Sequence, residues 1–264
     1  MALEGHQVVF VGGLHRSGTS PLHRVLATHP DVSTFSGTGV QEDEGQHLQD
    51  IYPPAAAHGG PGRFALDAAS HLTETSALRS ADAAARLAAA WSPHWDLTRL
   101  VLVEKSPPNL IRTRFLQALF PQAAFVMVVR HPVAVTLATR KWARGQAISA
   151  LLAHWFAAHE RLLADAPHVT RLQVISFERL TTQPQQVLSE LAGFLRVEGR
   201  FDGSSLRPGA NDDYAREWRE LRSAPLRRRS LARSVARYAG RAAHFGYDLD
   251  DLSTPGEWVV GHAT

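Results

Sequence analysis

The sequence predicts an α/β fold: a P-loop-like, doubly wound parallel β-sheet flanked by helices, in a single domain. Short apolar runs alternate along the chain with longer stretches of helical periodicity. Three of these runs are nearly continuous in Val, Leu, Ile, Phe and Met, as expected when helices cover both faces of a parallel sheet. We expect strands at residues 7–13, 31–35, 99–105, 124–130 and 171–177, and helices near residues 20–28, 75–91, 108–119, 132–142, 146–164 and 183–195.

The composition excludes several classes of protein. A hydrophobic content of 44% and a charged content of 20% are ordinary for a globular chain. The net charge of +3 suits an anionic ligand but does not indicate nucleic acid. The absence of cysteine excludes disulfides, thiolate metal sites and a cysteine nucleophile. Because no secretory leader and no apolar window of about 18 residues is present, we expect a cytoplasmic protein without a membrane span.

No repeat or linker divides the chain, and its length is compatible with one α/β domain. We therefore expect one domain over residues 1–264, with a core over 7–195 and an arginine-rich helical C-terminal part over 205–264. Nine arginines lie between residues 216 and 241. A solvated helix face is the favoured explanation for them, and a phosphate contact is the alternative.

A phosphate-binding loop is the first functional signal. The run GLHRSGTS, which begins at Gly13, matches the first six positions of the motif GxxxxGK[ST], but Thr19 replaces the lysine. Its glycines let backbone N–H groups converge on an anion, and the N-terminus of the following helix adds partial positive charge. Arg16 can grip a phosphate bidentately from within the loop. A glycine turn without a ligand is the alternative.

The residues at two other strand ends favour a second phosphate. A metal-dependent NTPase would carry an Asp at the end of a second apolar strand, whereas the strands here end in Glu104 and Lys105, and in Arg130 and His131. A buried arginine is costly without a partner, so Arg130 is either salt-bridged or bound to an anion, and we favour the anion. Lys105 ends a strand on the same side of the sheet, and a surface lysine paired with a carboxylate is its alternative.

Three segments in order make the pattern specific: HRSGTS, EKSPPNLIRTRFLQALFPQAAFVMVVRHP and VISFERLTTQPQQVLSELAGFL. Together they resemble the sulfotransferase family that uses 3'-phosphoadenosine 5'-phosphosulfate (PAPS). The resemblance covers residues 7 to about 195 and is strongest to the bacterial and Golgi-type branch, whose loop begins with Arg-Ser-Gly-Thr. It implies a P-loop-like α/β fold, PAPS as co-substrate and 3'-phosphoadenosine 5'-phosphate (PAP) as product.

The resemblance also implies roles for individual residues. Arg130 would hold the 3'-phosphate, and the family usually places a serine eight residues later, where this chain has Ala138. Thr136 or Thr139 could supply that hydroxyl, and Phe177 stands where many relatives have tyrosine. The residues expected to bind the 5'-phosphosulfate are Arg16, Ser17, Gly18, Thr19 and Ser20.

Candidate bases lie in the segment QEDEGQHLQD, residues 41–50. Sulfuryl transfer to a hydroxyl needs a base, and similar enzymes take a Glu or His from this part of the chain. Glu44 and His47 are three residues apart and would share one face of a helix. Glu44 is the first candidate and His47 the second, while a helix cap is the alternative for Asp43 or Glu44. Arg16 and Lys105 would stabilise the leaving phosphate.

Several other features are weaker signals. The histidines lack the HxH or HxxxH spacing of zinc sites, so we expect no metal. Trp142, Trp155 and Phe156 are predicted to lie in the core, and residues 53–64 form an irregular loop that is either a surface connection or a lid. In residues 211–218, Tyr214 or Trp218 could contact a ligand.

The function that the sequence predicts is sulfuryl transfer from PAPS to a hydroxyl of a small-molecule or carbohydrate acceptor, with a Glu or His base and no metal. The partners expected are this acceptor and no nucleic acid. A P-loop kinase or NTPase-like phosphotransferase is the first alternative, and a non-catalytic nucleotide-binding module, which Ala138 would favour, is the second. The sequence specifies neither the acceptor nor the oligomeric state.

Overall fold

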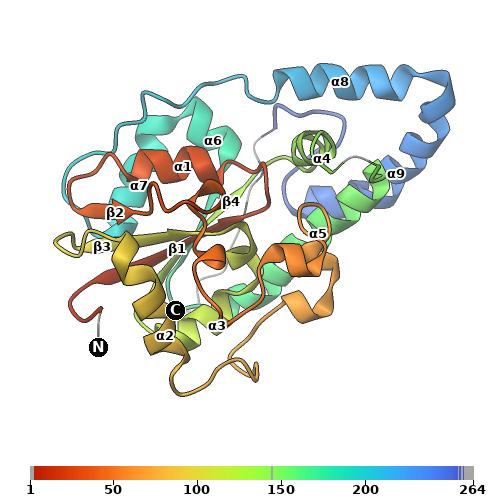
Figure 1. Ribbon diagram of the computed structural model, residues 1–264. Coiled ribbons are helices and arrows are strands. Elements are labelled where there is room, and N and C mark those ends of the chain that lie inside the picture. The colour runs from red at the N-terminus through yellow and green to blue at the C-terminus, as the bar shows by residue number, and fades with distance from the viewer. Residues whose placement is uncertain (1–2, 144, 255, 257, 259–264) are drawn as a thin grey trace.

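The computed structural model describes residues 3–143, 145–254, 256 and 258. Five parallel strands form one sheet in the order β2-β3-β1-β4-β5 (Figure 1). This arrangement confirms the predicted doubly wound parallel sheet, and each strand lies within its predicted range. The strands are β1 (Gln7–Gly13), β2 (Val32–Thr34), β3 (Val101–Lys105), β4 (Ala124–Val129) and β5 (Leu172–Ser176).

Helices cover both faces of the sheet, and successive strand side chains point to opposite faces. Val9 and Val126 pack in the core on one face, while Phe10 and Phe125 pack in the core on the other. In Figure 1, α1, α6 and α7 lie above the sheet, and α2, α3 and α5 lie below it. The bounds are α1 (Thr19–Leu26), α2 (Ala83–Trp91), α3 (Thr113–Leu119), α4 (Pro132–Arg140), α5 (Ile148–Asp165), α6 (Phe177–Thr182) and α7 (Pro184–Leu195).

Two predicted helices are shorter than expected. The helix expected over residues 75–91 begins only at Ala83, because hydroxyls before it bond locally: Ser80 Oγ donates to Asp82 Oδ1 at 2.6 Å. The helix expected over residues 108–119 is divided into a 3₁₀ turn (Pro107–Ile111) and α3.

The segment with the candidate bases is not a helix, so the prediction that Glu44 and His47 share a helix face was wrong. Residues Gln41–Asp43 and Gly45–His47 form two 3₁₀ turns, and Glu44 between them is extended, with φ −87° and ψ 123°. The Asp43 carboxylate accepts hydrogen bonds from the backbone N–H and the hydroxyl of Thr38, at 2.8 and 2.6 Å. This local turn competes with helix formation.

The loop over residues 53–64 is partly internal, so a simple surface connection does not describe all of it. Ala55 starts a 3₁₀ turn and is 2% exposed, and Phe64 is fully buried. The Phe64 ring packs edge-on against His154 of α5, with 4.9 Å between ring centroids. Burial of these two side chains anchors the loop against the body of the domain.

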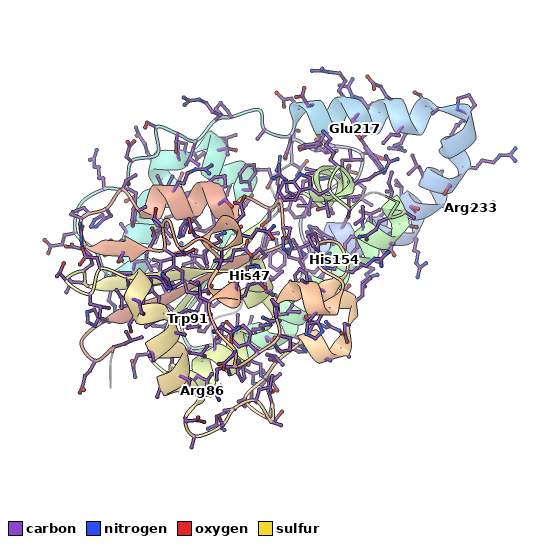
Figure 2. The ribbon with its side chains drawn as sticks, viewed as in Figure 1. His47, Arg86, Trp91, His154, Glu217 and Arg233 are labelled. Atoms are coloured by element: carbon purple, nitrogen blue, oxygen red, sulfur yellow. The ribbon has the colours of Figure 1, made fainter. Side chains whose placement is uncertain are left out.

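The C-terminal part contains α8 (Asp212–Ser223) and α9 (Pro225–His244), which lie beyond the end of the sheet (Figure 1). Figure 2 shows Glu217 on α8 and Arg233 on α9, both away from the sheet. Arg222 and Arg241 pair with Asp250 and Glu160, and the described arginines of α9 other than Arg241 are exposed and make no ion pair with described residues. The structure therefore confirms the predicted solvated helix face for Arg228, Arg229, Arg233 and Arg237. The Arg227 side chain and residues 255, 257 and 259–264 lie outside the described part.

In the described part of the chain, no helix is both long enough and apolar enough to cross a bilayer.

Candidate active site

The candidate residues gather at the carboxyl ends of the central strands. β1 and β4 are neighbours, but the chain goes on from β1 toward the β2 edge and from β4 toward the β5 edge. Ligands of doubly wound sheets bind at such a switch point. The phosphate loop follows β1 and Arg130 follows β4, while Lys105 lies opposite Val11 in the register of β3 with β1.

Two glycines allow the phosphate loop to close tightly. Gly13 has φ 154°, and a Cβ there would lie 2.5 Å from the Val128 carbonyl oxygen. Gly18 has φ 110°, and its Cβ would lie 2.2 Å from the Phe177 ring. A larger residue at either position would therefore push the loop away from the end of β4 and from α6.

The loop presents unused hydrogen-bond donors. Among the described residues, the backbone N–H groups of Gly18, Thr19 and Ser20 have no hydrogen-bond partner. Ser17 is fully buried, and its hydroxyl has no partner in the described part of the chain. Orphan donors at a helix N-terminus form a ready site for an anion. These residues fit the phosphosulfate group that the sequence predicts for them.

The segment with the candidate bases lies over this loop and is tied to β3. Lys105 Nζ donates to the Glu42 carbonyl oxygen at 2.7 Å and lies 3.3 Å from Glu44 Oε1. The Ser20 hydroxyl donates to Glu42 Oε2 at 3.1 Å, so Glu42 joins this cluster to the loop. Lys105 is paired with a carboxylate, as its alternative explanation held, but it is 1% exposed and is not a surface residue.

The surroundings of Glu44 shift the pKa of its carboxyl group. It is 5% exposed, and burial raises its pKa above the ordinary 4.5, although the Lys105 charge and a hydrogen bond from Gln46 oppose that shift. His47 Nε2 lies 3.8 Å from Glu44 Oε2. The two candidate bases are therefore adjacent. The Asp43 carboxylate accepts hydrogen bonds from Thr38, and these bonds lower the pKa of Asp43. Asp43 therefore serves to close a turn.

A buried polar network behind Glu44 is not evident from the sequence. Gln46 Nε2 donates to Glu44 Oε2 at 2.5 Å, and the Gln46 backbone N–H donates to Ser106 Oγ at 2.9 Å. The Ser106 hydroxyl in turn donates to Glu104 Oε1 at 2.6 Å, and Asn109 Nδ2 donates to the other oxygen of Glu104 at 2.5 Å. Burial raises the pKa of Glu104 to about 7. In the sequence, the only sign that Glu104 belongs to this network was its position next to Lys105.

Arg130 is buried, 7% exposed, and its guanidinium donates to three uncharged acceptors. Nε donates to Asn211 Oδ1 at 2.9 Å, and the two terminal nitrogens donate to the carbonyl oxygens of Arg16 and Ala210 at 3.1 and 2.7 Å. The guanidinium also lies over the Phe177 ring, 4.5 Å from its centroid. In the described part of the chain no carboxylate pairs with Arg130, so the salt-bridge alternative was wrong.

Arg16 and Trp142 form an exposed pair that the sequence reading missed. Trp142 is 56% exposed, so its predicted core position was wrong, whereas Trp155 and Phe156 are fully buried as predicted. The Arg16 guanidinium lies over the Trp142 ring, 4.9 Å from its centroid. Since α4 ends at Arg140, Trp142 follows the helix and escapes the packing of its buried face.

The expected replacements for the family serine are internal residues of α4. Ala138, Thr136 and Thr139 are 1%, 1% and 3% exposed. In the described part of the chain the Thr136 hydroxyl has no hydrogen-bond partner, and neither threonine bonds Arg130.

The two aromatic candidates of residues 211–218 differ in position. The Tyr214 ring lies beside Arg130, with 5.3 Å between the guanidinium carbon and the ring centroid. Trp218 is 1% exposed and donates its indole N–H to the Leu249 carbonyl oxygen at 2.8 Å, so it belongs to the core.

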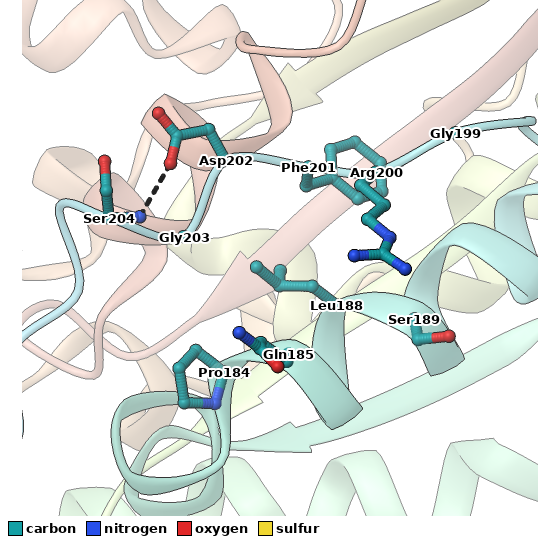
Figure 3. Close-up of a pocket in the computed structure, with 10 residues that line it drawn as sticks. All are labelled: Pro184, Gln185, Leu188, Ser189, Gly199, Arg200, Phe201, Asp202, Gly203 and Ser204. Carbon is teal, nitrogen blue, oxygen red and sulfur yellow. Dashed lines mark hydrogen bonds between the residues drawn. The ribbon is translucent and has the colours of Figure 1, made fainter.

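A cavity of about 620 Å³ lies away from these residues, between the first half of α7 and residues 199–204 (Figure 3). None of the residues that line this cavity is among the site residues predicted from the sequence. A second cavity, of about 330 Å³, is lined by the start of α8 and residues 250–253. Of its lining residues, Asn211 accepts a hydrogen bond from Arg130. In the described part of the chain, no group of three or more His, Asp or Glu side chains is arranged to hold a metal ion.

Comparison with known proteins gives the family and a similar fold. The model of the sulfotransferase family matches residues 8–202, well over half of the chain. The fold is similar to that of the sulfotransferase domain from the Synechococcus PCC 7002 olefin synthase, with a TM-score of 0.52 and 19% identity over 94% of this chain and 98% of that chain. No curated protein sequence matches the chain.

Two further solved structures are more distant. Sulfotransferase STF1 from Mycobacterium tuberculosis H37Rv has a TM-score of 0.43 and 17% identity over 74% of this chain and 68% of that chain. Mouse sulfotransferase SULT7A1, solved in complex with PAP, has a TM-score of 0.43 and 13% identity over 83% of this chain and 67% of that chain. On the match to the family model, this chain belongs to the sulfotransferase family and is a sulfotransferase.

Proposed function

We propose that this sulfotransferase transfers the sulfuryl group of PAPS to a hydroxyl of a small-molecule or carbohydrate acceptor. The observation that carries the proposal is the meeting of two anion sites at the switch point of the sheet. One is the phosphate loop with its free N–H groups, and the other is the buried Arg130, which bonds the loop carbonyl of Arg16. PAPS has a phosphosulfate and a separate 3'-phosphate, so it needs two such sites.

The loop binds the phosphosulfate in this proposal, and Arg130 binds the 3'-phosphate. The N–H groups of Gly18, Thr19 and Ser20 and the Ser17 hydroxyl are the donors for the phosphosulfate. Arg16 lies at the rim of the loop and adds a guanidinium there. Thr136 and Thr139 remain candidates for a further contact to the nucleotide, which would require α4 to move, because both side chains are buried.

When bound, PAPS supplies the sulfuryl group and leaves as PAP. The Glu44 carboxylate removes the proton of the acceptor hydroxyl, and its raised pKa makes it a stronger base than an ordinary glutamate. Lys105 keeps Glu44 oriented and, with Arg16, offsets the negative charge that develops on the leaving phosphate. His47 is the second candidate base, and its Nε2 lies 3.8 Å from Glu44 Oε2. The positive charge at this site comes from side chains, so we expect transfer without a metal ion.

Calorimetry tests the donor. The protein is titrated with PAP and, separately, with ATP and magnesium, and the PAP titration contains EDTA. We expect PAP to bind in EDTA and to bind more tightly than ATP with magnesium. A preference for ATP with magnesium would contradict the proposal and favour a phosphotransferase. Tight PAP binding without sulfuryl transfer from PAPS to any of a broad panel of hydroxyl acceptors would instead favour a non-catalytic binding module.

A further inference from the structure

Asn211 joins two buried charges that come from distant parts of the chain. Its side-chain Oδ1 accepts a hydrogen bond from Arg130 Nε at 2.9 Å, and its Nδ2 donates to Glu178 Oε1 at 2.8 Å. Arg130 follows β4, Glu178 lies in the first turn of α6, and Asn211 directly precedes α8. One amide therefore links the end of the sheet, α6 and α8.

The amide is suited to this position because it presents an acceptor and a donor at once. A guanidinium can only donate and an ionised carboxylate can only accept. The Glu178 carboxylate is itself held in place, since it accepts from the His131 backbone N–H at 2.9 Å and from the Ser176 hydroxyl at 3.0 Å. Because Glu178 is held in place, it fixes the position of the Asn211 amide, and the amide in turn orients the Arg130 guanidinium.

The remaining contacts of Arg130 leave it prepared for an anion. A guanidinium has five N–H groups, and here three of them donate to acceptors in the described part of the chain. One N–H on each terminal nitrogen has no acceptor in the described part of the chain and is free to donate to an anion. Phe177 and Tyr214 lie beside the guanidinium at 4.5 and 5.3 Å and restrict its plane.

We infer that Asn211 is a positioning residue for the phosphate monoester bound by Arg130, and that it orients this guanidinium in a chain whose family serine position is Ala138. The inference rests on the proposed function, in which that monoester is the 3'-phosphate of the nucleotide. Asn211 acts through Arg130, and its effect is expected on ligands with a 3'-phosphate and not on ligands without one.

The experiment compares PAP with adenosine 5'-phosphosulfate, which lacks the 3'-phosphate, by calorimetry on the full chain. Asn211→Leu keeps the branched shape of the side chain but has neither the donor nor the acceptor. We expect it to weaken PAP about tenfold or more, the size of one charge-assisted hydrogen bond, and to change adenosine 5'-phosphosulfate less than about twofold. Asn211→Asp should weaken PAP further, because the carboxylate would pair with Arg130 and repel both Glu178 and the phosphate. Asn211→Gln, which retains the amide, should recover part of the affinity.

Asp213→Asn is the matched control, since Asp213 lies in the same first turn of α8, is exposed and forms an exposed ion pair with Arg216. Urea unfolding of each variant shows whether α8 remains attached. Equal losses for both ligands in Asn211→Leu would mean that Asn211 only holds α8, and would overturn the inference. Unchanged PAP affinity in that variant would overturn it as well. If the wild-type protein itself does not prefer PAP to adenosine 5'-phosphosulfate, the proposed function fails, and the inference fails with it.

Discussion

Lys105 Nζ lies 3.3 Å from Glu44 Oε1, and both residues are buried. Their positions are 61 residues apart in the chain. A buried pair of this kind is held by its two charges together, because each charge has lost its water and depends on the other. The pair thus connects the stability of the candidate active site to its chemistry.

Removing one member of this pair should destabilise the protein strongly. We expect Lys105→Met to lower the free energy of unfolding by about 3–5 kcal/mol, since it leaves the Glu44 carboxylate buried without its partner. The double variant Lys105→Met, Glu44→Gln should lose less than the sum of the two single changes. Urea unfolding of the wild type, the two single variants Lys105→Met and Glu44→Gln, and the double variant measures this coupling. Arg86→Met is the control: Arg86 and Asp50 form an exposed pair, so the loss should stay within about 1 kcal/mol. An additive double variant would contradict the coupling.

Glu44→Gln should lower turnover about 10²–10⁴-fold once an acceptor is known, while PAP affinity changes little, because the amide cannot take the acceptor proton. The base must be ionised to act, so the wild-type kcat/KM should rise with pH through a pKa above the ordinary 4.5 of glutamate. Glu44→Gln should lose this acidic limb, which a pH–rate profile measures. His47→Ala is assayed in parallel. If Glu44→Gln retains near wild-type turnover and His47→Ala does not, His47 is the base.

Glu104 should make the protein less stable as pH rises through neutrality. Burial raises its pKa in the folded protein to about 7, against 4.5 in the unfolded chain. Its proton is held more tightly in the folded state, so its contribution to stability is fully present below pH 4.5 and is lost as pH rises through 7. Relative to Glu104→Gln, the wild type should lose about 3 kcal/mol of unfolding free energy between pH 4.5 and 8. Chemical unfolding of both proteins across this range gives the difference, in which the contributions of other groups cancel. A constant difference would refute the assignment.

Gly18→Ala should weaken both the fold and the binding of PAP. The substitution combines a left-handed backbone, φ 110°, with a Cβ placed 2.2 Å from the Phe177 ring. Gly37→Ala is the matched control, because Gly37 has φ 66° but nothing within 4 Å of its Cβ, so it should cost only about 1–2 kcal/mol of strain. The loss in Gly18→Ala should exceed this and should shrink when Phe177→Leu makes room. Thermal unfolding and PAP calorimetry measure both effects, and equal losses for the two alanines would exclude the steric explanation.

Arg130→Ala should reduce PAP affinity about 10–100-fold more than the affinity for adenosine 5'-phosphosulfate, because only PAP has the phosphate assigned to this guanidinium. Calorimetry with both ligands measures the ratio. Arg216→Ala serves as the control, since Arg216 is an exposed arginine of α8 that forms a surface ion pair with Asp213. Equal losses for the two ligands would contradict a 3'-phosphate role for Arg130.

The sequence by itself determined the parts of the molecule that depend on local pattern. Apolar runs predicted all five strands, because a strand covered on both faces has few polar positions. The loop from Gly13 to Ser20 was predicted from its glycines and its place between strand and helix, since its conformation depends on neighbouring residues. Arg130 and Lys105 were recognised for the same reason: both stand at strand ends, and parallel strands bring those ends to one edge.

Only the tertiary structure decided which side chains meet there. Asn211 lies 81 residues from Arg130, and no spacing rule relates the two positions. The exposure of Trp142 depends on where α4 ends and on which elements pack around it, so an apolar residue type alone gave the wrong answer. Glu44 meets Lys105 although its segment is not a helix, because hydrogen bonds to β3 and its following turn draw residues 42–46 over the phosphate loop. Periodicity records which face of an element is buried, whereas contacts between distant segments arise only when whole elements pack together.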